Sequence, residues 1–191
     1  MNIIVIGPKN KSDIIQGPVI NTTSGSKTWS KALSPFFLGP VKLYGNYMSK
    51  NMENAWQFSK VYQIFVDKDT GNPSHLYFRW ATTGWNDTYA HRYPLGKSMR
   101  PEYAWWDGKK LDYIEARKKI YVPLYAEAVK GTEAFKKLQE EAEKNETIYL
   151  WDFDGYNHKA MGMTYEDVVD EPSMKMGHAF VLAMLLEGYL Q

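Results

Sequence analysis

The absence of cysteine from this chain of 191 residues is the feature that most limits how it can fold. Without cysteine, the chain cannot form a disulfide scaffold, a reactive thiolate or a zinc site with sulfur ligands. The fold must depend on a packed core. Apolar residues make up 44% of the sequence, which is enough for a core and too many for a disordered chain. The length predicts one compact domain, or at most a domain with an appended arm.

Charge and hydropathy narrow the class of protein further. The 23 basic and 22 acidic residues give a formal net charge of +1, which argues against a general polyanion binder but permits a local basic cleft. No apolar run approaches the roughly 18 residues that a membrane span needs. The first seven residues lack the basic flank of a signal peptide. We therefore expect a soluble, cytoplasmic protein without a membrane partner.

Aromatic residues make up 15% of the chain, with 7 Trp, 14 Tyr and 8 Phe. A core can absorb many of these side chains. Nucleobases and sugars are also held by stacking on aromatic faces. The composition therefore suits a ligand pocket, although it does not identify the ligand.

The apolar pattern predicts a mainly helical α+β fold with a few short strands. The segment 82–107, rich in Trp, is expected to be irregular, and 76–80 to be a strand or the start of a helix. Strands are expected at 3–6 and 147–151. Helices are expected at 48–65 with Ser49 as N-cap, at 111–130 with a kink or a new start at Pro123, at 132–144 with Thr132 as N-cap, and at 170–187.

The sharpest local feature is a polar stripe in the first expected helix. Glu53, Gln57 and Lys60 have the spacing i, i+4 and i+7, which places them on one helix face close to Trp56 and Tyr62. A solvated helix face often carries Glu and Lys, and that is the alternative interpretation. A tryptophan is unusual on such a face, so the stripe is a candidate pocket wall.

A second feature follows the strand at 147–151, where alternation would place Asp152 and Asp154 on the same side. Two such carboxylates can share a proton, hold a divalent cation or orient a water. An ordinary Asp-Gly turn also explains Asp154. A calcium loop is a poor fit, because Tyr156 occupies the third ligand position and no glutamate closes a loop of twelve residues.

One further group of residues is a candidate for binding. Arg92, Lys97 and Arg100 precede Tyr103 and two tryptophans, a mixture that suits phosphate contacts beside a stacked base. A surface loop with inward tryptophans is the alternative.

The histidines are sparse. His178 has apolar neighbours and fits a hydrogen-bonded core histidine better than a ligand. The sequence contains no histidine pair with metal spacing and none of the glycine patterns of hydrolases, kinases or dehydrogenases.

Over residues 33–190, the chain resembles the NADAR superfamily of YbiA-like N-glycosidases. The resemblance rests on an aromatic segment at 33–41, on the Glu53, Gln57 and Lys60 pattern, on Arg100 with Trp105 or Trp106 before a long helix, and on an acidic strand end followed by an apolar helix. It implies one domain over 1–191, in which 1–32 is an N-terminal extension with a short strand. The closing loop departs from the family because it lacks the family's asparagine. Within the family, the sequence looks closer to a divergent phage and bacterial branch of unknown function.

The resemblance implies hydrolysis of a ribose–base or ribose–amine bond, without cofactor or metal. The substrate would be a ribosylated small molecule or an ADP-ribosylated base. A nucleic acid would be contacted only at its modified nucleotide. Removal of ADP-ribose from such a base would serve an anti-toxin or anti-defence role. The implied catalytic residues are Glu53 and Asp152 or Asp154. The implied substrate-binding residues are Trp56, Gln57, Lys60, Arg92, Arg100, Trp106, Tyr156, His178, Asn21 and Thr23. The alternative is a module without catalysis that binds ADP-ribose or a nucleotide, or that inhibits a host defence factor.

Overall fold

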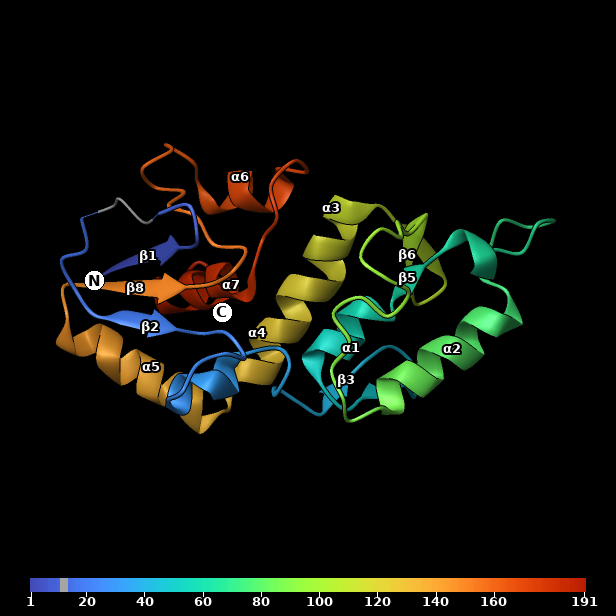
Figure 1. Cartoon of the computed structure of the whole chain (residues 1–191), viewed down its shortest axis with the longest axis horizontal. Coiled ribbons are helices and arrows are strands. Elements are labelled where there is room, and N and C mark those ends of the chain that lie inside the picture. Colours follow the sequence, from blue (N-terminus) through green and yellow to red (C-terminus); the bar gives the residue numbers. More distant parts are fainter. Residues whose placement is uncertain (11–13) are drawn as a thin grey trace. The chain divides into compact units, whose positions relative to one another are not determined.

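The computed structural model describes residues 1–10 and 14–191, and its contacts divide the chain into two compact units (Figure 1). Unit 1 contains Met1–Ser34 and Tyr125–Gln191, and unit 2 contains Pro35–Leu124. The boundary falls within helix α4 (Val122–Lys130). The fold is α+β and mainly helical with short strands, as the sequence predicts. That residues 1–191 form one domain stays a prediction.

Unit 1 is built around a parallel sheet with the strand order β1-β8-β2. In the register of this sheet, Ile3 pairs with Ile148 and Ile20 with Leu150. The elements of unit 1 are β1 (Asn2–Ile6), β2 (Val19–Asn21), η1 (Trp29–Leu33), α5 (Glu133–Lys144), β8 (Thr147–Trp151), α6 (Tyr165–Asp170) and α7 (His178–Leu186).

The sheet of unit 1 has a central strand that is buried on both faces. Ile148, Tyr149 and Leu150 of β8 are consecutive and all buried, which is typical of a parallel strand covered by helices on both sides. Helix α7 packs on β1 and β8, and α5 packs on β8 and η1. Residues 1–32, which the resemblance treats as an extension, supply two of the three strands of this sheet. The strand expected at 3–6 and the one at 147–151 are confirmed.

Glu187, just after α7, covers the outer edge of β1. Its carboxylate accepts hydrogen bonds from the Ile3 amide (2.9 Å), the Tyr165 hydroxyl (2.8 Å) and the Lys159 ammonium (2.6 Å). Edge strands with free backbone groups invite pairing with other chains. This carboxylate therefore closes the sheet edge and fixes the end of α7 to it.

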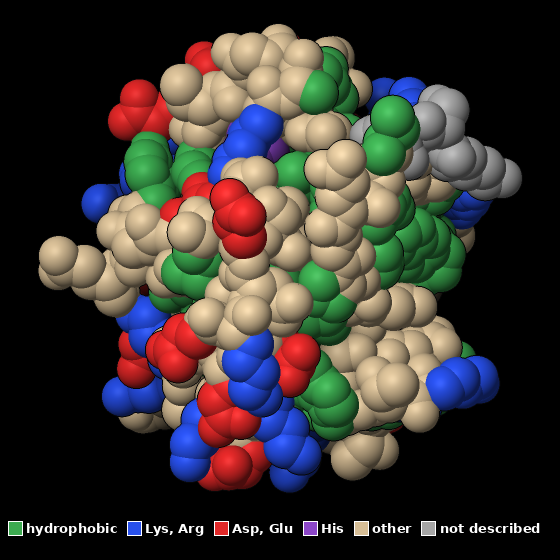
Figure 2. Space-filling view, turned by 90° about the vertical axis from the view of Figure 1, so that its left-hand side faces the viewer, with side chains coloured by type: hydrophobic (Ala, Val, Ile, Leu, Met, Phe, Trp, Pro, Cys, Tyr) green, Lys and Arg blue, Asp and Glu red, His purple; other side chains and the backbone are tan. Residues whose placement is uncertain are grey.

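Helix α5 begins where the sequence predicts. The Thr132 hydroxyl accepts a hydrogen bond from the Phe135 amide at 3.1 Å, which satisfies one of the free donors of the first turn. Ala134, Phe135 and Leu138 are buried on its inner face. The outer face carries basic and acidic side chains, which Figure 2 shows interleaved at the lower end of the view.

Unit 2 combines short helices with two small antiparallel sheets, β3-β4 and β5-β6-β7. Its elements are β3 (Val41–Lys42), β4 (Met48–Ser49), α1 (Met52–Gln57), β5 (Lys60–Val61), η2 (Gln63–Phe65), α2 (His75–Asn86), β6 (Tyr103–Trp106), β7 (Lys109–Leu111), α3 (Tyr113–Ala116) and the π-helical turn η3 (Arg117–Tyr121).

The long helix expected at 48–65 is wrong in extent. Only α1 is α-helical there. Met48–Ser49 and Lys60–Val61 pair in β4 and β5, and Gln63–Phe65 forms the 3-10 turn η2, so strand pairing overrides the local helical pattern. The expected cap at Ser49 is also wrong, because the Asn51 side chain accepts the hydrogen bond from the Asn54 amide at 2.8 Å.

Other helix boundaries also differ from the expectation. The segment 111–130 begins with Leu111 in β7 and is helical without a break from Tyr113 to Lys130 through α3, η3 and α4, so Pro123 lies inside this helical run, just after the π-helical turn η3. The helix expected at 170–187 is wrong at its start, since α6 ends at Asp170 and α7 begins at His178. The segment 76–80 is helical, and 82–107 contains the end of α2 and the strand β6.

No helix within residues 1–10 and 14–191 combines the length and the apolar character needed to cross a membrane.

Candidate functional site

The polar stripe of unit 2 forms a largely buried hydrogen-bonded chain that runs from α1 to β5. The Lys60 ammonium donates to the Gln57 amide oxygen at 2.8 Å, and the Gln57 amide nitrogen donates to the Glu53 carboxylate at 2.9 Å. Glu53 and Gln57 are each 7% exposed, whereas Lys60 is half-buried. The geometry aligns the Gln57 amide between the ammonium and the carboxylate. A carboxylate is thereby held in one orientation with a positive charge two hydrogen bonds away.

Trp56 lies beside this chain of hydrogen bonds. The Lys60 ammonium lies 5.1 Å from the centre of the Trp56 ring, within the range of a cation–π interaction. The Trp56 ring also contacts the Tyr121 ring edge-on, with 5.1 Å between the two ring centres. Trp56 and Trp106 both pack, half-buried, against the apolar cluster around Ala104. Lys60 therefore reaches Gln57 and Trp56 although it lies on β5 and not on the helix that the sequence predicts.

Of the basic residues expected to bind phosphate, Arg92 and Arg100 lie in the segment between α2 and β6. Arg92 lies over the Tyr93 ring at 5.6 Å, and Arg100 is exposed in the loop before β6. Trp106 contacts the Tyr44 ring edge-on at 4.9 Å.

Arg117 and Tyr121 are residues of this region that the sequence interpretation missed. Arg117 is 2% exposed, its guanidinium donates to the Tyr113 hydroxyl at 2.8 Å, and it lies 4.3 Å from that ring. Both residues lie on the π-helical turn η3, a distortion that is frequent at functional sites. The spacing of Tyr113, Arg117 and Tyr121 at i, i+4 and i+8 is the signal that marks this face in the sequence.

The remaining predicted site residues lie in unit 1, where the chain brings Asp152 and His178 together. The Asp152 carboxylate contacts the His178 Nδ1 at 3.0 Å and accepts hydrogen bonds from the amides of Ala179 (3.1 Å) and Asp154 (3.3 Å). Asp152 and His178 are 4% and 5% exposed. Burial raises the pKa of the Asp152 carboxyl, but the charge of His178 and these hydrogen bonds lower it to about 2.

Asp152 and Asp154 do not form the paired carboxylates that strand alternation predicts. Strand β8 ends at Trp151, and the chain turns so that Asp152 faces inward while Asp154 lies 3.9 Å from the Lys175 ammonium. A Cβ atom at Gly177 would lie 2.2 Å from the Asp152 carboxylate, so only glycine fits there. Asp152 is therefore committed to internal contacts and is a structural residue of unit 1.

Asn21, Thr23 and Tyr156 also lie in unit 1. The Asn21 side-chain oxygen accepts from both the amide (2.9 Å) and the hydroxyl (2.8 Å) of Thr23, so these two residues hold one another in a turn after β2. Tyr156 is buried, and its ring packs on Phe180 at 4.7 Å. Tyr156 is consequently a core residue of this unit.

The charges are divided unevenly between the two units. Unit 2 contains 13 of the 23 basic residues and 8 of the 22 acidic residues, a formal charge of +5, which leaves −4 for unit 1. The two charges nearly cancel, which gives the whole chain its net charge of +1. The unit that contains Glu53 is thus the one that attracts anions.

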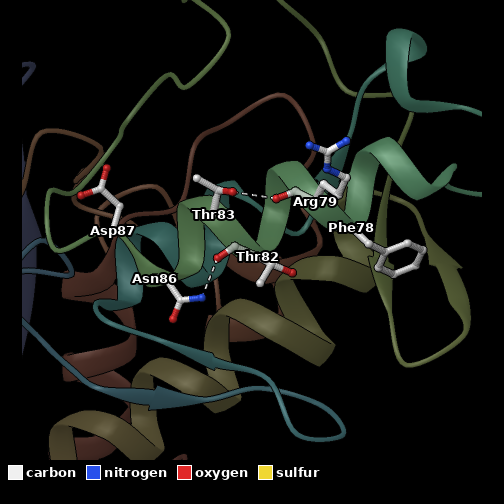
Figure 3. A pocket seen from close by; sticks show the side chains of 6 residues that line it. All are labelled: Phe78, Arg79, Thr82, Thr83, Asn86 and Asp87. Atoms are coloured by element: carbon white, nitrogen blue, oxygen red, sulfur yellow. Dashed lines mark hydrogen bonds between the residues drawn. The ribbon is translucent and has the colours of Figure 1, made fainter.

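A shallow depression of about 800 Å³ lies on the outer face of α2 in unit 2 (Figure 3). The side chains that line it come from successive turns of the helix, and Thr83 and Asn86 donate back to the carbonyl oxygens of Arg79 and Thr82 at 2.9 Å. No residue predicted from the sequence lines this depression. Within the described part of the chain, no group of three or more His, Asp or Glu side chains is arranged to hold a metal ion.

The comparisons with known proteins do not place the chain in a family. It matches no protein-family profile, and no curated protein sequence is significantly similar to it. The resemblance to the NADAR superfamily therefore rests on the quoted residues alone.

Proposed function

We propose that the protein hydrolyses the N-glycosidic bond between a ribose and a base or amine, with Glu53 as the principal carboxylate. One observation carries the proposal: Glu53 is almost buried and is held by Gln57, which is itself held by Lys60 beside Trp56. The proposed substrates are ADP-ribose attached to a nucleobase, in nucleic acid or free, and ribosylated small molecules. The proposed setting is the cytoplasm, where such nucleotides occur, including a host cytoplasm if a phage encodes the chain.

The chemistry of this bond calls for a fixed carboxylate. When the bond between C1′ and nitrogen breaks, its electron pair moves to the nitrogen and the ribose becomes positively charged, like an oxocarbenium ion. A fixed carboxylate stabilises that charge more strongly than water does. A water oxygen then bonds to C1′ and transfers a proton to Glu53, while the leaving nitrogen takes up a proton from solvent.

The neighbours of Glu53 have separate proposed roles. Gln57 is a positioning residue because its amide fixes the carboxylate at 2.9 Å. Lys60 holds the Gln57 amide in place and presents a positive charge to a substrate phosphate. Trp56 offers a half-buried ring for stacking on the base or the ribose. The charge of +5 on unit 2 favours an anionic substrate.

The test is turnover by Glu53→Gln on a panel of ADP-ribosylated guanine and thymine oligonucleotides and ribosylaminopyrimidine phosphates, with products followed by mass spectrometry. We expect the variant to fold and to lose at least about 100-fold in rate, the scale of one acid–base group. Glu102→Gln is the matched control, because Glu102 is an exposed glutamate of the same unit. Full activity of Glu53→Gln refutes the proposal.

A second candidate function is a module that binds ADP-ribose or a nucleotide without catalysis. The observation that favours it is the engagement of Asp152, the expected second carboxylate, by His178 and two backbone amides. This function predicts a rise in melting temperature with ADP-ribose and no released product over hours. Release of free ADP-ribose or ribose phosphate by the wild-type chain excludes it.

A further inference from the structure

The ring of His178 lies between two hydrogen-bond acceptors from different parts of unit 1. Its Nδ1 is 3.0 Å from the Asp152 carboxylate, and its Nε2 is 2.8 Å from the carbonyl oxygen of Thr22. The histidine begins α7, the aspartate follows β8, and the threonine follows β2. One buried ring thus joins three segments at the carboxyl end of the parallel sheet.

The protonation state of this ring follows from its partners. A carboxylate and a backbone carbonyl can only accept hydrogen bonds, whereas a neutral imidazole has one donor and one acceptor nitrogen. Both contacts are satisfied together only when both ring nitrogens carry protons. If one ring nitrogen lost its proton, its lone pair would face the lone pair of the acceptor oxygen, and that hydrogen bond would be lost.

We propose that His178 is a pH-sensitive clasp, whose doubly protonated ring holds the loop after β2 against the start of α7 and releases it when the ring loses a proton. The proton that remains stays on Nδ1, which faces the Asp152 carboxylate, because a hydrogen bond to a charged group is stronger than one to a backbone carbonyl. The contact that breaks is therefore the one to the Thr22 carbonyl.

The loop after β2 is held together by its own hydrogen bonds, so we expect its residues to move as one segment. The hydroxyl of Ser30 bonds to the hydroxyls of Ser26 (2.9 Å) and Thr28 (3.0 Å), and it donates to the Asn21 carbonyl at 2.6 Å. The amide and the hydroxyl of Thr22 both remain bonded to the Trp151 carbonyl when the clasp opens. The release is therefore a loosening of the residues that follow Thr22, which include Thr23, and not an unfolding of β2.

The charged and titratable groups that face the His178 ring lie after β8, before α7 and on α4. Asp152 is the counter-charge after β8, and Asp154 lies behind it, paired at 3.9 Å with Lys175 from the segment before α7. From α4, the Tyr125 ring lies 5.6 Å from the imidazole, and burial and the charge of Asp152 raise its pKa, so it stays neutral. The counter-charge that holds the second proton on the ring is therefore Asp152. This inference needs no substrate and is independent of the proposed function.

The test is a pH titration of the full chain, with the imidazole nitrogen shifts of His178 and the amide hydrogen exchange of residues 23–28 measured by NMR. At neutral pH we expect both nitrogens protonated and the loop protected. As the ring loses a proton at alkaline pH, protection of the loop should fall about 10- to 100-fold relative to β8, the scale of one hydrogen bond to a charged group.

Two variants complete the test. His178→Gln removes the titrating ring, so the alkaline step in loop exchange should disappear, whereas His158→Phe, which removes another buried histidine of the same unit, should keep it. A neutral His178 ring at neutral pH, or loss of its proton without a change in loop exchange, overturns the proposal. The wild-type titration decides the matter even if His178→Gln does not fold.

Discussion

His158 offers the sharpest test of the energetics of unit 1. It is 2% exposed, and its ring lies 4.8 Å from that of Tyr165 and 5.6 Å from that of Phe180. Its Nδ1 is buried and has no hydrogen-bond partner among the described residues. Burial and, to a lesser extent, the charge of Lys159 lower the pKa of His158 from 6.5 to about 4, and the charge of Glu187 partly opposes them.

This pKa determines how stability changes with pH. Above about 6.5 the histidine is neutral in both the folded and the unfolded chain. Between 6.5 and about 4 the unfolded chain binds a proton that the folded chain does not, so the free energy of unfolding falls as the pH falls. At about 1.4 kcal/mol per pKa unit, the full loss is at most about 3 kcal/mol, of which about 2 kcal/mol is lost by about pH 5.

The assay is urea unfolding of the wild type and of His158→Phe at neutral pH and at about pH 5. Phenylalanine keeps a ring against Tyr165 and Phe180 but cannot titrate, so the wild type should lose about 2 kcal/mol more than the variant on acidification. His75→Phe, at an exposed position of α2, is the control and should follow the wild type. Equal losses for the wild type and His158→Phe would refute the reasoning.

Two other substitutions test the packing of each unit. Asp152→Asn leaves the buried His178 ring without its counter-charge, so urea unfolding should show a loss of about 3–5 kcal/mol, and wild-type stability would contradict the structural role of Asp152. Gly84→Ala would place a Cβ atom 2.1 Å from the Phe58 ring and should cost about 1–3 kcal/mol. Gly131→Ala, where the space is open, should change stability by less than about 0.5 kcal/mol, and similar losses for the two glycine variants would contradict the close contact at Phe58.

The sequence by itself determined the features that depend on neighbouring residues. The β-branched run at 3–6, the strand at 147–151 and the Thr132 cap were readable because periodicity and capping act over a few residues. The grouping of Glu53 with Gln57 follows from their spacing of four on one helix. These short-range signals also sufficed for the α+β class.

Only the tertiary structure decided which residues are internal and which helices stop early. The segment 48–65 is helical by local pattern, yet β4 at its start pairs with β3, and β5 within it pairs with β6, far along the chain. Asp152 is predicted from the sequence to act beside Asp154 as a catalytic carboxylate, whereas the fold places it against His178, 26 residues later in sequence. The Thr22 carbonyl, on the other side of that ring, is 156 residues from it. Pairings at such separations leave no local pattern, because their free energy comes from burial and charge that exist only after folding.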